Sequence, residues 1–254
     1  MASSFARSAE PAPPLAETAA ALSHELREAA PELREAAPAE IISRALRLVR
    51  PGRLAVVSSF GTESAVLLKF VADVDRSLPV LFLDTGWLFK ETLAYRDRLV
   101  AHLGLTDVRT LIPSPSALVM NDPRRDLCLR DHDACCAIRK VAPLAAELAS
   151  FDGWINGRKR YQGGERGGLP AVEADGGRLK FNPLARLSRA DIDAVFEIAG
   201  LPRHPLEALG FASVGCVPCT SRANAQTGRD GRWSGAGKTE CGIHTRALAA
   251  VVAP

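Results

Sequence analysis

The pattern of hydrophobic and polar residues predicts alternating strands and helices through most of the chain. Residues 54–59 form a compact β-branched run, and apolar residues recur at helical spacing through residues 64–71. Further strands are predicted at 79–83, 107–112 and 154–156, and further helices in the segment ending at 103 and over 137–150 and 189–199. Such alternation is typical of an α/β fold with a Rossmann-like, doubly wound parallel sheet, which we therefore expect.

Both ends of the chain depart from this pattern. Residues 1–40 are rich in Ala, Pro and Glu, and a repeat at 25–31 and 32–38 ends each time in a proline that interrupts a helix. This composition favours a low-complexity tail over a partner-binding arm. After about Pro205, Gly, Pro, Cys and Arg dominate, so residues 206–254 need an external constraint to be ordered. We expect the α/β domain to occupy residues 41–205.

Length and charge narrow the range of partners. The chain has 254 residues, 47% of them hydrophobic, which suits one domain with extensions. Its net charge is +3 without a long Lys/Arg block, so we expect no nucleic-acid partner, and a small anionic substrate fits well. We find no secretory signal and no uninterrupted apolar run of membrane-spanning length, and we therefore expect a cytoplasmic protein with no membrane association.

The cysteines point to two different chemistries. In reducing cytosol, closely spaced cysteines are more often metal ligands or catalytic thiols than disulfides. Cys135 and Cys136 are adjacent, and Cys216 and Cys219 form a Cys-Val-Pro-Cys pair, so four thiols are available to one metal centre. Cys241 stands apart in Glu-Cys-Gly-Ile-His, which suggests a separate nucleophile.

The adjacent pair restricts the kind of metal centre. Neighbouring side chains on a helix point roughly 100° apart, so Cys135 and Cys136 reach one centre only if it is larger than an atom or the turn is distorted. A 4Fe-4S cube, with one thiolate per iron, tolerates this better than tetrahedral zinc. Alone, the pair is more typical of buried thiols, and Cys216 and Cys219 make ligation the favoured interpretation. Cys128 is interpreted as a buried or idle thiol.

The surroundings of Cys241 favour a reactive thiolate. Gly242 leaves the thiol accessible and His244 is nearby. Positive neighbours stabilise the thiolate, which is the attacking form, and the segment carries Arg229, Arg232 and Lys238. If Glu-Cys-Gly is considered without these surroundings, an unreactive surface thiol in a frayed tail is the alternative interpretation of Cys241.

Residues 58–64, Ser-Ser-Phe-Gly-Thr-Glu-Ser, lie between the first predicted strand and its helix. Backbone N–H groups and the helix dipole at such a junction hold phosphate or sulfate. The loop lacks the Gly-Lys-Ser/Thr ending of a Walker loop, and an ordinary capped turn is the alternative. Its position at the carboxyl end of a strand favours ligand binding.

Together these motifs resemble the phosphoadenylyl-sulfate and adenylyl-sulfate reductase family, and in particular its assimilatory, thioredoxin-dependent adenylyl-sulfate branch. The resemblance runs from Val56 to His244 through residues 59–64, 83–86, 135–144, 216–220, 228–233 and 240–244. It implies a fold like the adenine nucleotide alpha-hydrolases. In this fold, residues 41–205 would be the nucleotide-binding domain, and residues 206–254 would bind the cluster and carry the catalytic cysteine.

The resemblance also implies the site residues. A 4Fe-4S cluster would tie the C-terminal segment through Cys135, Cys136, Cys216 and Cys219. Cys241, on a mobile segment, would be catalytic together with Lys140 and His244. The substrate would contact Ser58, Ser59, Gly61, Glu63, Ser64, Leu83, Asp84, Arg160, Arg229 and Arg232.

The activity implied is the reduction of adenylyl sulfate by thioredoxin to sulfite and AMP, through an S-sulfocysteine on Cys241. Relatives that use the 3'-phosphorylated nucleotide usually lack the two cysteine pairs, so the unphosphorylated substrate is expected. A phosphoadenylyl-sulfate or dual-specificity reductase is the alternative. A homo-oligomer is compatible with the sequence.

Some features stay open. Lys159 stands where many relatives carry Arg, so Arg160 is expected to be the anion contact, and Arg166 is either a substrate contact or a solvated loop residue. A tRNA-thiolating pyrophosphatase is disfavoured, because Phe60 and Glu63 replace the Gly and Asp of Ser-Gly-Gly-x-Asp-Ser. A metal module that only binds partners is the other rival.

Overall fold

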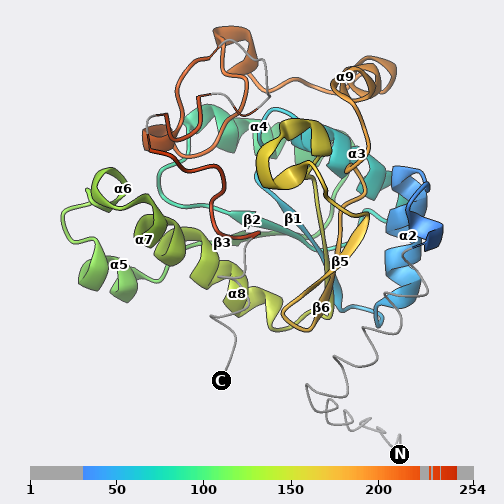
Figure 1. Ribbon diagram of the computed structural model, residues 1–254, viewed down its shortest axis with the longest axis horizontal. Helices are drawn as coiled ribbons and strands as arrows, with labels where there is room; N and C mark the ends of the chain where they lie inside the picture. Colours follow the sequence, from blue (N-terminus) through green and yellow to red (C-terminus); the bar gives the residue numbers. More distant parts are fainter. Residues whose placement is uncertain (1–30, 224–228, 230, 235, 245–254) are drawn as a thin grey trace, which may run out of the picture.

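The centre of the computed structural model, which describes residues 31–223, 229, 231–234 and 236–244, is a sheet of strand order β3-β2-β1-β4-β6-β5 (Figure 1). The strands are β1 (Leu54–Ser58), β2 (Val80–Leu83), β3 (Val108–Leu111), β4 (Gly153–Asn156), β5 (Val172–Asp175) and β6 (Arg178–Phe181). All neighbouring strands pair parallel except β5, which is antiparallel to β6. The predicted α/β fold is confirmed.

The antiparallel edge corrects the expectation of a wholly parallel sheet. Gly176 and Gly177 join β5 to β6, and their φ angles are 56° and 81°. Two consecutive residues with positive φ make the tight turn that joins antiparallel strands, and glycine adopts it without a Cβ clash. Strands β5 and β6 were not predicted, because their short sequences lack a clear hydrophobic pattern.

The helices cover both faces of the sheet. They are α2 (Pro38–Leu48), α3 (Ser64–Val74), α4 (Lys90–Leu103), α5 (Pro115–Asn121), α6 (Leu127–Arg130), α7 (His132–Cys136), α8 (Ala142–Leu148) and α9 (Arg189–Ile198). One core layer lies between the sheet and α2, α3, α4 and α9, and a second lies between the sheet and α8. Val56 points into the first layer and Val57 into the second, as alternation along a doubly wound strand requires.

The helix predicted over 137–150 begins earlier and is interrupted. A π-helical turn, η1 (Ala137–Val141), separates α7 from α8, and the Ala142 N–H bonds to the Ala137 carbonyl. Pro143 explains the interruption, because it has no N–H to donate to the preceding turn. The turn that follows Cys135 and Cys136 is therefore distorted, which is one of the conditions under which both thiols reach one centre.

Part of the predicted tail packs against the domain. Residues 1–30, with most of the first repeat, lie outside the described residues, whereas Leu33 is only 2% exposed and packs in the core. The boundary predicted at residue 40 falls inside α2, a helix that the sequence analysis did not predict. Ile41, Ile42 and Ala45 bury one face of this helix.

Beyond Pro205, the described residues contain only short 3-10 turns, η4 (Glu207–Leu209) and η5 (Val217–Cys219). This agrees with the predicted loop-rich segment. Figure 1 shows the segment in orange to red, and its last described residue, His244, stacks on Trp154 of β4. In the described part of the chain, no helix has the length and apolar character needed to cross a membrane.

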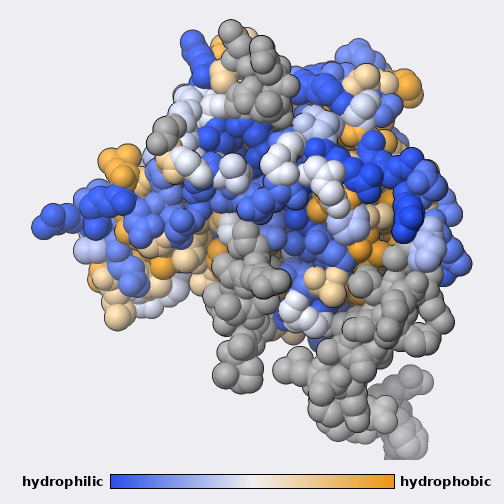
Figure 2. All heavy atoms as spheres, in the orientation of Figure 1, coloured by the Kyte–Doolittle hydropathy of each residue, from blue (hydrophilic) through white to orange (hydrophobic). Residues whose placement is uncertain are grey.

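The α5–α6 region exposes several large apolar side chains. Helix α5 has no buried residue, and Val119 and Met120 on it are 71% and 79% exposed. Leu129 on α6 is 74% exposed. Figure 2 shows these helices on the left edge, with apolar atoms lying among hydrophilic ones. This region contributes little to the two core layers.

Candidate active site and metal centre

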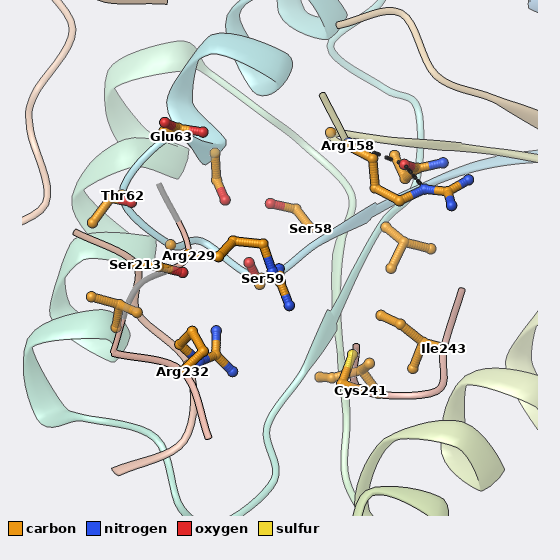
Figure 3. Close-up of a pocket in the computed structure, with 18 of the residues that line it drawn as sticks. Ser58, Ser59, Thr62, Glu63, Arg158, Ser213, Arg229, Arg232, Cys241 and Ile243 are labelled. Carbon is orange, nitrogen blue, oxygen red and sulfur yellow. Dashed lines mark hydrogen bonds between the residues drawn. The ribbon is translucent and has the colours of Figure 1, made fainter. Parts of the chain in front are cut away.

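A pocket opens between the β1–α3 loop and the C-terminal segment, at the carboxyl ends of β1 and β4 (Figure 3). Ligands bind at this edge of open α/β sheets. The pocket brings together most of the predicted site residues: Ser58, Ser59, Gly61, Glu63, Ser64, Leu83, Lys140, Cys216, Arg229, Arg232, Cys241 and His244. Their shared position supports the predicted loop as a binding element.

The β1–α3 loop is held in an unusual conformation. Phe60 has a φ of 47° and is fully buried, and its ring meets Phe82 edge-on at a centroid distance of 5.3 Å. A non-glycine residue at positive φ is strained and persists only where its surroundings hold it. Packing of the Phe60 ring on β2 thus turns the backbone of the loop toward the pocket.

The same loop touches the C-terminal segment. The Thr62 hydroxyl donates to the Ala212 carbonyl at 3.2 Å, and a Cβ on Gly61 would lie 3.3 Å from the Val214 carbonyl oxygen. Glycine at position 61 therefore permits the two backbones to approach closely.

Glu63 lines the pocket, but its carboxylate is already saturated. It accepts hydrogen bonds from Lys159 Nζ at 2.8 Å, Tyr161 Oη at 2.5 Å and Gln162 Nε2 at 3.0 Å, and it pairs with Arg189 at 3.3 Å. Burial raises the pKa of Glu63, but Lys159, Tyr161 and Arg189 outweigh it and leave the pKa lowered. Glu63 thus joins the loop to the β4 end and to α9. Lys159, left open by the sequence, lines the pocket as the partner of Glu63.

Two predicted substrate contacts do not reach the pocket lining. Arg160 Nε donates to the Leu169 carbonyl at 2.8 Å, and Asp84 Oδ1 accepts the Gly86 N–H at 2.9 Å. The pocket instead receives Arg158, which the sequence analysis missed, and Arg166. Arg158 follows the carboxyl end of β4, and that position is a signal that would have found it.

Arg158 and Arg166 are buried cations with acidic partners. Arg158 pairs with Glu173, and its Nε donates to Asn156 Oδ1 at 3.2 Å. Burial lowers the pKa of Arg158, which Glu173 partly offsets. Arg166 pairs with Glu240 through two nitrogens, one of them at 2.9 Å. Glu240 immediately precedes Cys241, so Arg166 fixes one side of the thiol's segment.

Trp233 organises the cations of the C-terminal segment. The charged groups of Arg232, Arg229 and Lys238 lie 4.5 Å, 5.5 Å and 5.8 Å from its ring centroid. Cations over an indole face are attracted by its quadrupole. Burial, reinforced by Arg166, lowers the pKa of Arg229 to about 10, so this arginine remains a cation at neutral pH. The pocket therefore holds concentrated positive charge suited to anions.

The four paired cysteines are buried, free of disulfides and close to one another. Cys216 and Cys219 pack with Trp233 and Trp87, and Cys135 packs with Cys128 in a cluster that also includes Trp87. A bridge between Leu88 and Cys216 joins this segment to the loop after β2. Thr85 Oγ1 lies 3.2 Å from Cys216 Sγ. The fold thus brings both pairs to one region beside the pocket.

Two buried donors beside these thiols bear on whether a metal centre fits there. Among the described residues, no group of three or more His, Cys, Asp and Glu side chains is arranged to hold a metal ion. Trp87 Nε1 and Trp233 Nε1 are buried beside the cysteines, and neither has a hydrogen-bond partner in the described structure. Buried donors without partners are costly, and the sulfurs of a cluster would accept from them.

Lys140 and His244 differ in charge. Burial disfavours the charged form of Lys140, but Cys216, Cys241 and Cys136 outweigh it and raise its pKa. Burial lowers the pKa of His244 well below its ordinary value, and Arg158 and Lys180 reinforce this. His244 is therefore neutral at pH 7, and its ring stacks on Trp154, which was not predicted as a site residue.

Comparisons with known proteins give a matching family model and several similar proteins. The family model of the phosphoadenosine phosphosulfate reductase domain matches residues 53–222. The chain is 48% identical over 210 residues to an adenosine 5'-phosphosulfate reductase of Mesorhizobium japonicum, covering 82% of this chain and 83% of that protein. It is 39% identical over 198 residues to a phosphoadenosine 5'-phosphosulfate reductase of Gloeobacter violaceus, covering 76% and 82%.

Solved structures share the fold. A phosphoadenylyl-sulfate reductase from Candida auris aligns with a TM-score of 0.59 at 20% identity, covering 80% of this chain and 94% of that one. An FMN adenylyltransferase from Candida glabrata aligns with a TM-score of 0.51 at 17% identity, covering 80% and 71%. At these identities the likeness concerns the fold alone.

Proposed function

The chain belongs to the phosphoadenosine phosphosulfate reductase family, and we propose that it reduces adenylyl sulfate to sulfite and AMP in sulfate assimilation. The 48% identity to proteins named adenosine 5'-phosphosulfate reductases supports this substrate. The observation that carries the proposal is Cys241, a free thiol that lines the same pocket as the β1–α3 loop and the buried cations. A nucleophile, an anion-binding loop and positive charge are the parts that sulfuryl transfer to a thiol requires.

The pocket offers separate surfaces to the parts of the substrate. Leu83, at the end of β2, gives an apolar contact suited to the nucleoside, and the β1–α3 loop presents backbone N–H groups to an anion. Lys140, Arg229 and Arg232 would surround the sulfate and phosphate oxygens. Their charges stabilise the negative charge that develops as the bond to the phosphate breaks.

The first step is transfer of the sulfuryl group to the enzyme. The Cys241 thiolate attacks the sulfate sulfur, so that an S–S bond forms and the bond from sulfur to the phosphate oxygen breaks. The electron pair of that bond leaves with AMP, and Cys241 becomes an S-sulfocysteine. His244, neutral in its buried position, would support this segment rather than add a cation.

The second step regenerates the thiol. A thiolate of reduced thioredoxin attacks Cys241 Sγ and sulfite leaves, and the second thioredoxin thiol then releases Cys241 by forming the thioredoxin disulfide. The dithiol supplies the two electrons, so sulfate sulfur is reduced to sulfite. Free cysteines and thioredoxin both belong to a reducing compartment, which supports the cytoplasm as the location.

Cys135, Cys136, Cys216 and Cys219 would hold a 4Fe-4S cluster. Burial raises the pKa of Cys135 to about 12 and that of Cys136 to about 11, so without a metal these thiols would be protonated. When bound, the cluster would supply a tether between the C-terminal segment and α7 and a charged centre beside Lys140. The two-electron reduction itself needs only thiols.

The central test is a reaction without reductant. Wild-type protein mixed with adenylyl sulfate should release one equivalent of AMP and stop, and its intact mass should increase by one SO3 group on the Cys241 peptide. Thioredoxin should remove this group. Cys241→Ser should bind nucleotide and release no AMP, whereas Cys128→Ser should behave as wild type. An adduct on another cysteine, or AMP released beyond one equivalent, would overturn the mechanism.

The choice of nucleotide is a separate test, because one relative is named for the 3'-phosphorylated substrate. The specificity constant for adenylyl sulfate should exceed that for the 3'-phosphorylated form by roughly 100-fold, about 2.7 kcal/mol of transition-state binding. Equal constants would instead identify a dual-specificity reductase.

A further inference from the structure

The segment that carries Cys241 ends against two side chains of the sheet. The His244 ring stacks on the Trp154 indole with a centroid distance of 5.6 Å and an interplanar angle of 5°. Lys180 Nζ lies 3.5 Å from the His244 carbonyl oxygen, to which it donates, and 4.8 Å from the centroid of the Trp154 ring. Trp154 on β4 and Lys180 on β6 are direct register partners. Two strands therefore present one composite surface to His244.

This surface is buried, and polar contacts hold both side chains. Trp154 is 0% exposed and Lys180 is 2% exposed. Trp154 Nε1 donates to Asp175 Oδ2 at 3.1 Å, and the Lys180 ammonium lies 3.7 Å from Glu173 and 3.8 Å from Asp175. A buried lysine is costly even with carboxylates nearby, and a purely apolar side chain would cover Trp154 without that cost. The hydrogen bond to the His244 carbonyl is the specific contact that a lysine adds.

Contacts that hold His244 in place also restrict the position of Cys241. Only Gly242 and Ile243 separate the two residues, and Ile243 packs on the same core layer as Trp154. Gly242 has a φ of 86°, and a Cβ there would lie 3.3 Å from Val141. The chain thus bends sharply between the thiol and the histidine. On the other side, Glu240 is held by Arg166, so the thiol is anchored from both directions.

We propose that Trp154 and Lys180 are positioning residues that hold the Cys241 segment in its docked place at the pocket. This proposal rests on the proposed function, because it takes Cys241 as the nucleophile. The pair, called here the Trp154–Lys180 clamp, touches neither the thiol nor the predicted ligands of the cluster in any contact described above. It acts through His244 and through the core layer that Trp154 shares with Ile243.

The clamp has a consequence for the order of steps. In the docked place Cys241 lines the pocket and is only half exposed, which suits attack on a bound nucleotide. Thioredoxin is a protein, and its thiol has to reach Cys241 Sγ, so the segment has to leave the pocket for the second step. Weakening the clamp should therefore slow the first step and spare the second.

The test uses Lys180→Met, which keeps an apolar stem on Trp154 and removes the donor to His244. The matched control is Arg178→Met, on the same strand and the same face, where the guanidinium donates to the Leu148 and Phe151 carbonyls instead. Trp154→Phe is the second variant, because it retains a buried ring but reduces the stack. All three are prepared as the full chain with its cofactor content measured.

The first readout is the rate at which iodoacetamide alkylates Cys241, followed by peptide mass without any nucleotide. Lys180→Met and Trp154→Phe should raise this rate about fivefold or more as the released population grows, and Arg178→Met should leave it unchanged. The second readout is single-turnover AMP release from adenylyl sulfate, which should slow in proportion to the loss of the docked population. Reduction of a preformed S-sulfocysteine by thioredoxin should proceed at the wild-type rate or faster.

Unchanged alkylation in Lys180→Met, or the same increase in Arg178→Met, would overturn the clamp. Equal slowing of both half-reactions would do so as well, because that indicates general damage to the fold. If the wild-type protein releases no AMP from adenylyl sulfate, the proposed function fails instead. The alkylation comparison needs no substrate and still decides whether the clamp exists.

Discussion

The sheet domain and the C-terminal segment are held together by different forces. In the sheet domain, backbone ladders join the strands, and apolar helix faces such as Ile41, Ile42 and Ala45 of α2 pack on them. In the described part of the C-terminal segment, regular structure is limited to short turns, and order depends on side chains. Trp233 under three cations, Glu240 on Arg166 and His244 on Trp154 are the principal contacts.

The two regions therefore supply different parts of the proposed site. The sheet domain supplies the fixed partners, including the β1–α3 loop, Arg166 and Trp154. The C-terminal segment supplies Cys216, Cys219, Arg229, Arg232 and Cys241. Substitutions in the first region should chiefly change the free energy of unfolding, whereas substitutions in the second should change the site while the fold persists. Three predictions test this contrast, from the largest expected effect to the smallest.

The largest effect is expected where the proposed cluster would tie the two regions together. Cys219→Ser should abolish the iron-sulfur absorbance near 400 nm and lower turnover by more than about 100-fold, because ligand loss also removes folding energy from the C-terminal segment. Proteolysis should then cut that segment before the sheet domain. Cys128→Ser is the matched control, since Cys128 is also a buried thiol, and it should retain the absorbance. Full absorbance in Cys219→Ser would remove that residue from the ligand set.

Two glycines test the contrast directly. In the sheet domain, a Cβ on Gly153 of β4 would lie 2.7 Å from a Val49 methyl carbon and 3.3 Å from the Leu179 carbonyl oxygen. Gly153→Ala should therefore destabilise the fold by about 2 kcal/mol through overpacking, as measured by urea denaturation.

In the C-terminal segment, a Cβ on Gly215 would lie 2.2 Å from Arg232 Nη2, the end of a flexible side chain that can move. Gly215→Ala should leave the free energy of unfolding nearly unchanged and raise KM for adenylyl sulfate about tenfold, because Arg232 is displaced. An equal loss in the free energy of unfolding in Gly215→Ala and Gly153→Ala would contradict the proposed difference between the two regions.

The smallest effect concerns the pH dependence of stability in the sheet domain. His204 is 1% exposed, and its Nδ1 accepts the Leu206 N–H at 3.2 Å while its Nε2 faces Thr92 Oγ1 at 3.1 Å. Burial lowers the pKa of His204 to about 4. Since an unfolded histidine has a pKa of about 6.5, the unfolded state binds more protons between these values, and stability falls as the pH drops through that window.

This single group should lower the free energy of unfolding by about 2 kcal/mol between pH 7 and pH 5. His244 is also buried as a neutral ring and adds to the fall in the free energy of unfolding over this pH range. The comparison is therefore made between wild type and His204→Gln. The free energy of unfolding of His204→Gln should fall by about 2 kcal/mol less than that of wild type. Urea denaturation at both pH values gives the difference. Parallel losses in the two proteins would show that His204 is not buried as a neutral imidazole.

The sequence alone determined the features that depend on neighbouring residues. The β-branched run at 54–59 and the helical periodicity after it became β1 and α3, because period and composition are local properties. The cysteine spacing likewise identified two pairs and a separate thiol, all of which the fold brings to one side of the sheet. The β1–α3 loop was found because a strand-to-helix junction fixes where N–H groups point.

Only the tertiary structure decided which side chains meet. Arg158 reaches the pocket and Arg160 does not, although both follow β4, because the chain turns at Arg160 and directs it to Leu169. Trp154 and Lys180 are 26 positions apart, and their meeting with His244 depends on the β4–β6 register. Contacts of this kind join residues from separate elements. Their geometry follows from how the whole chain packs, and no local pattern in the sequence encodes it.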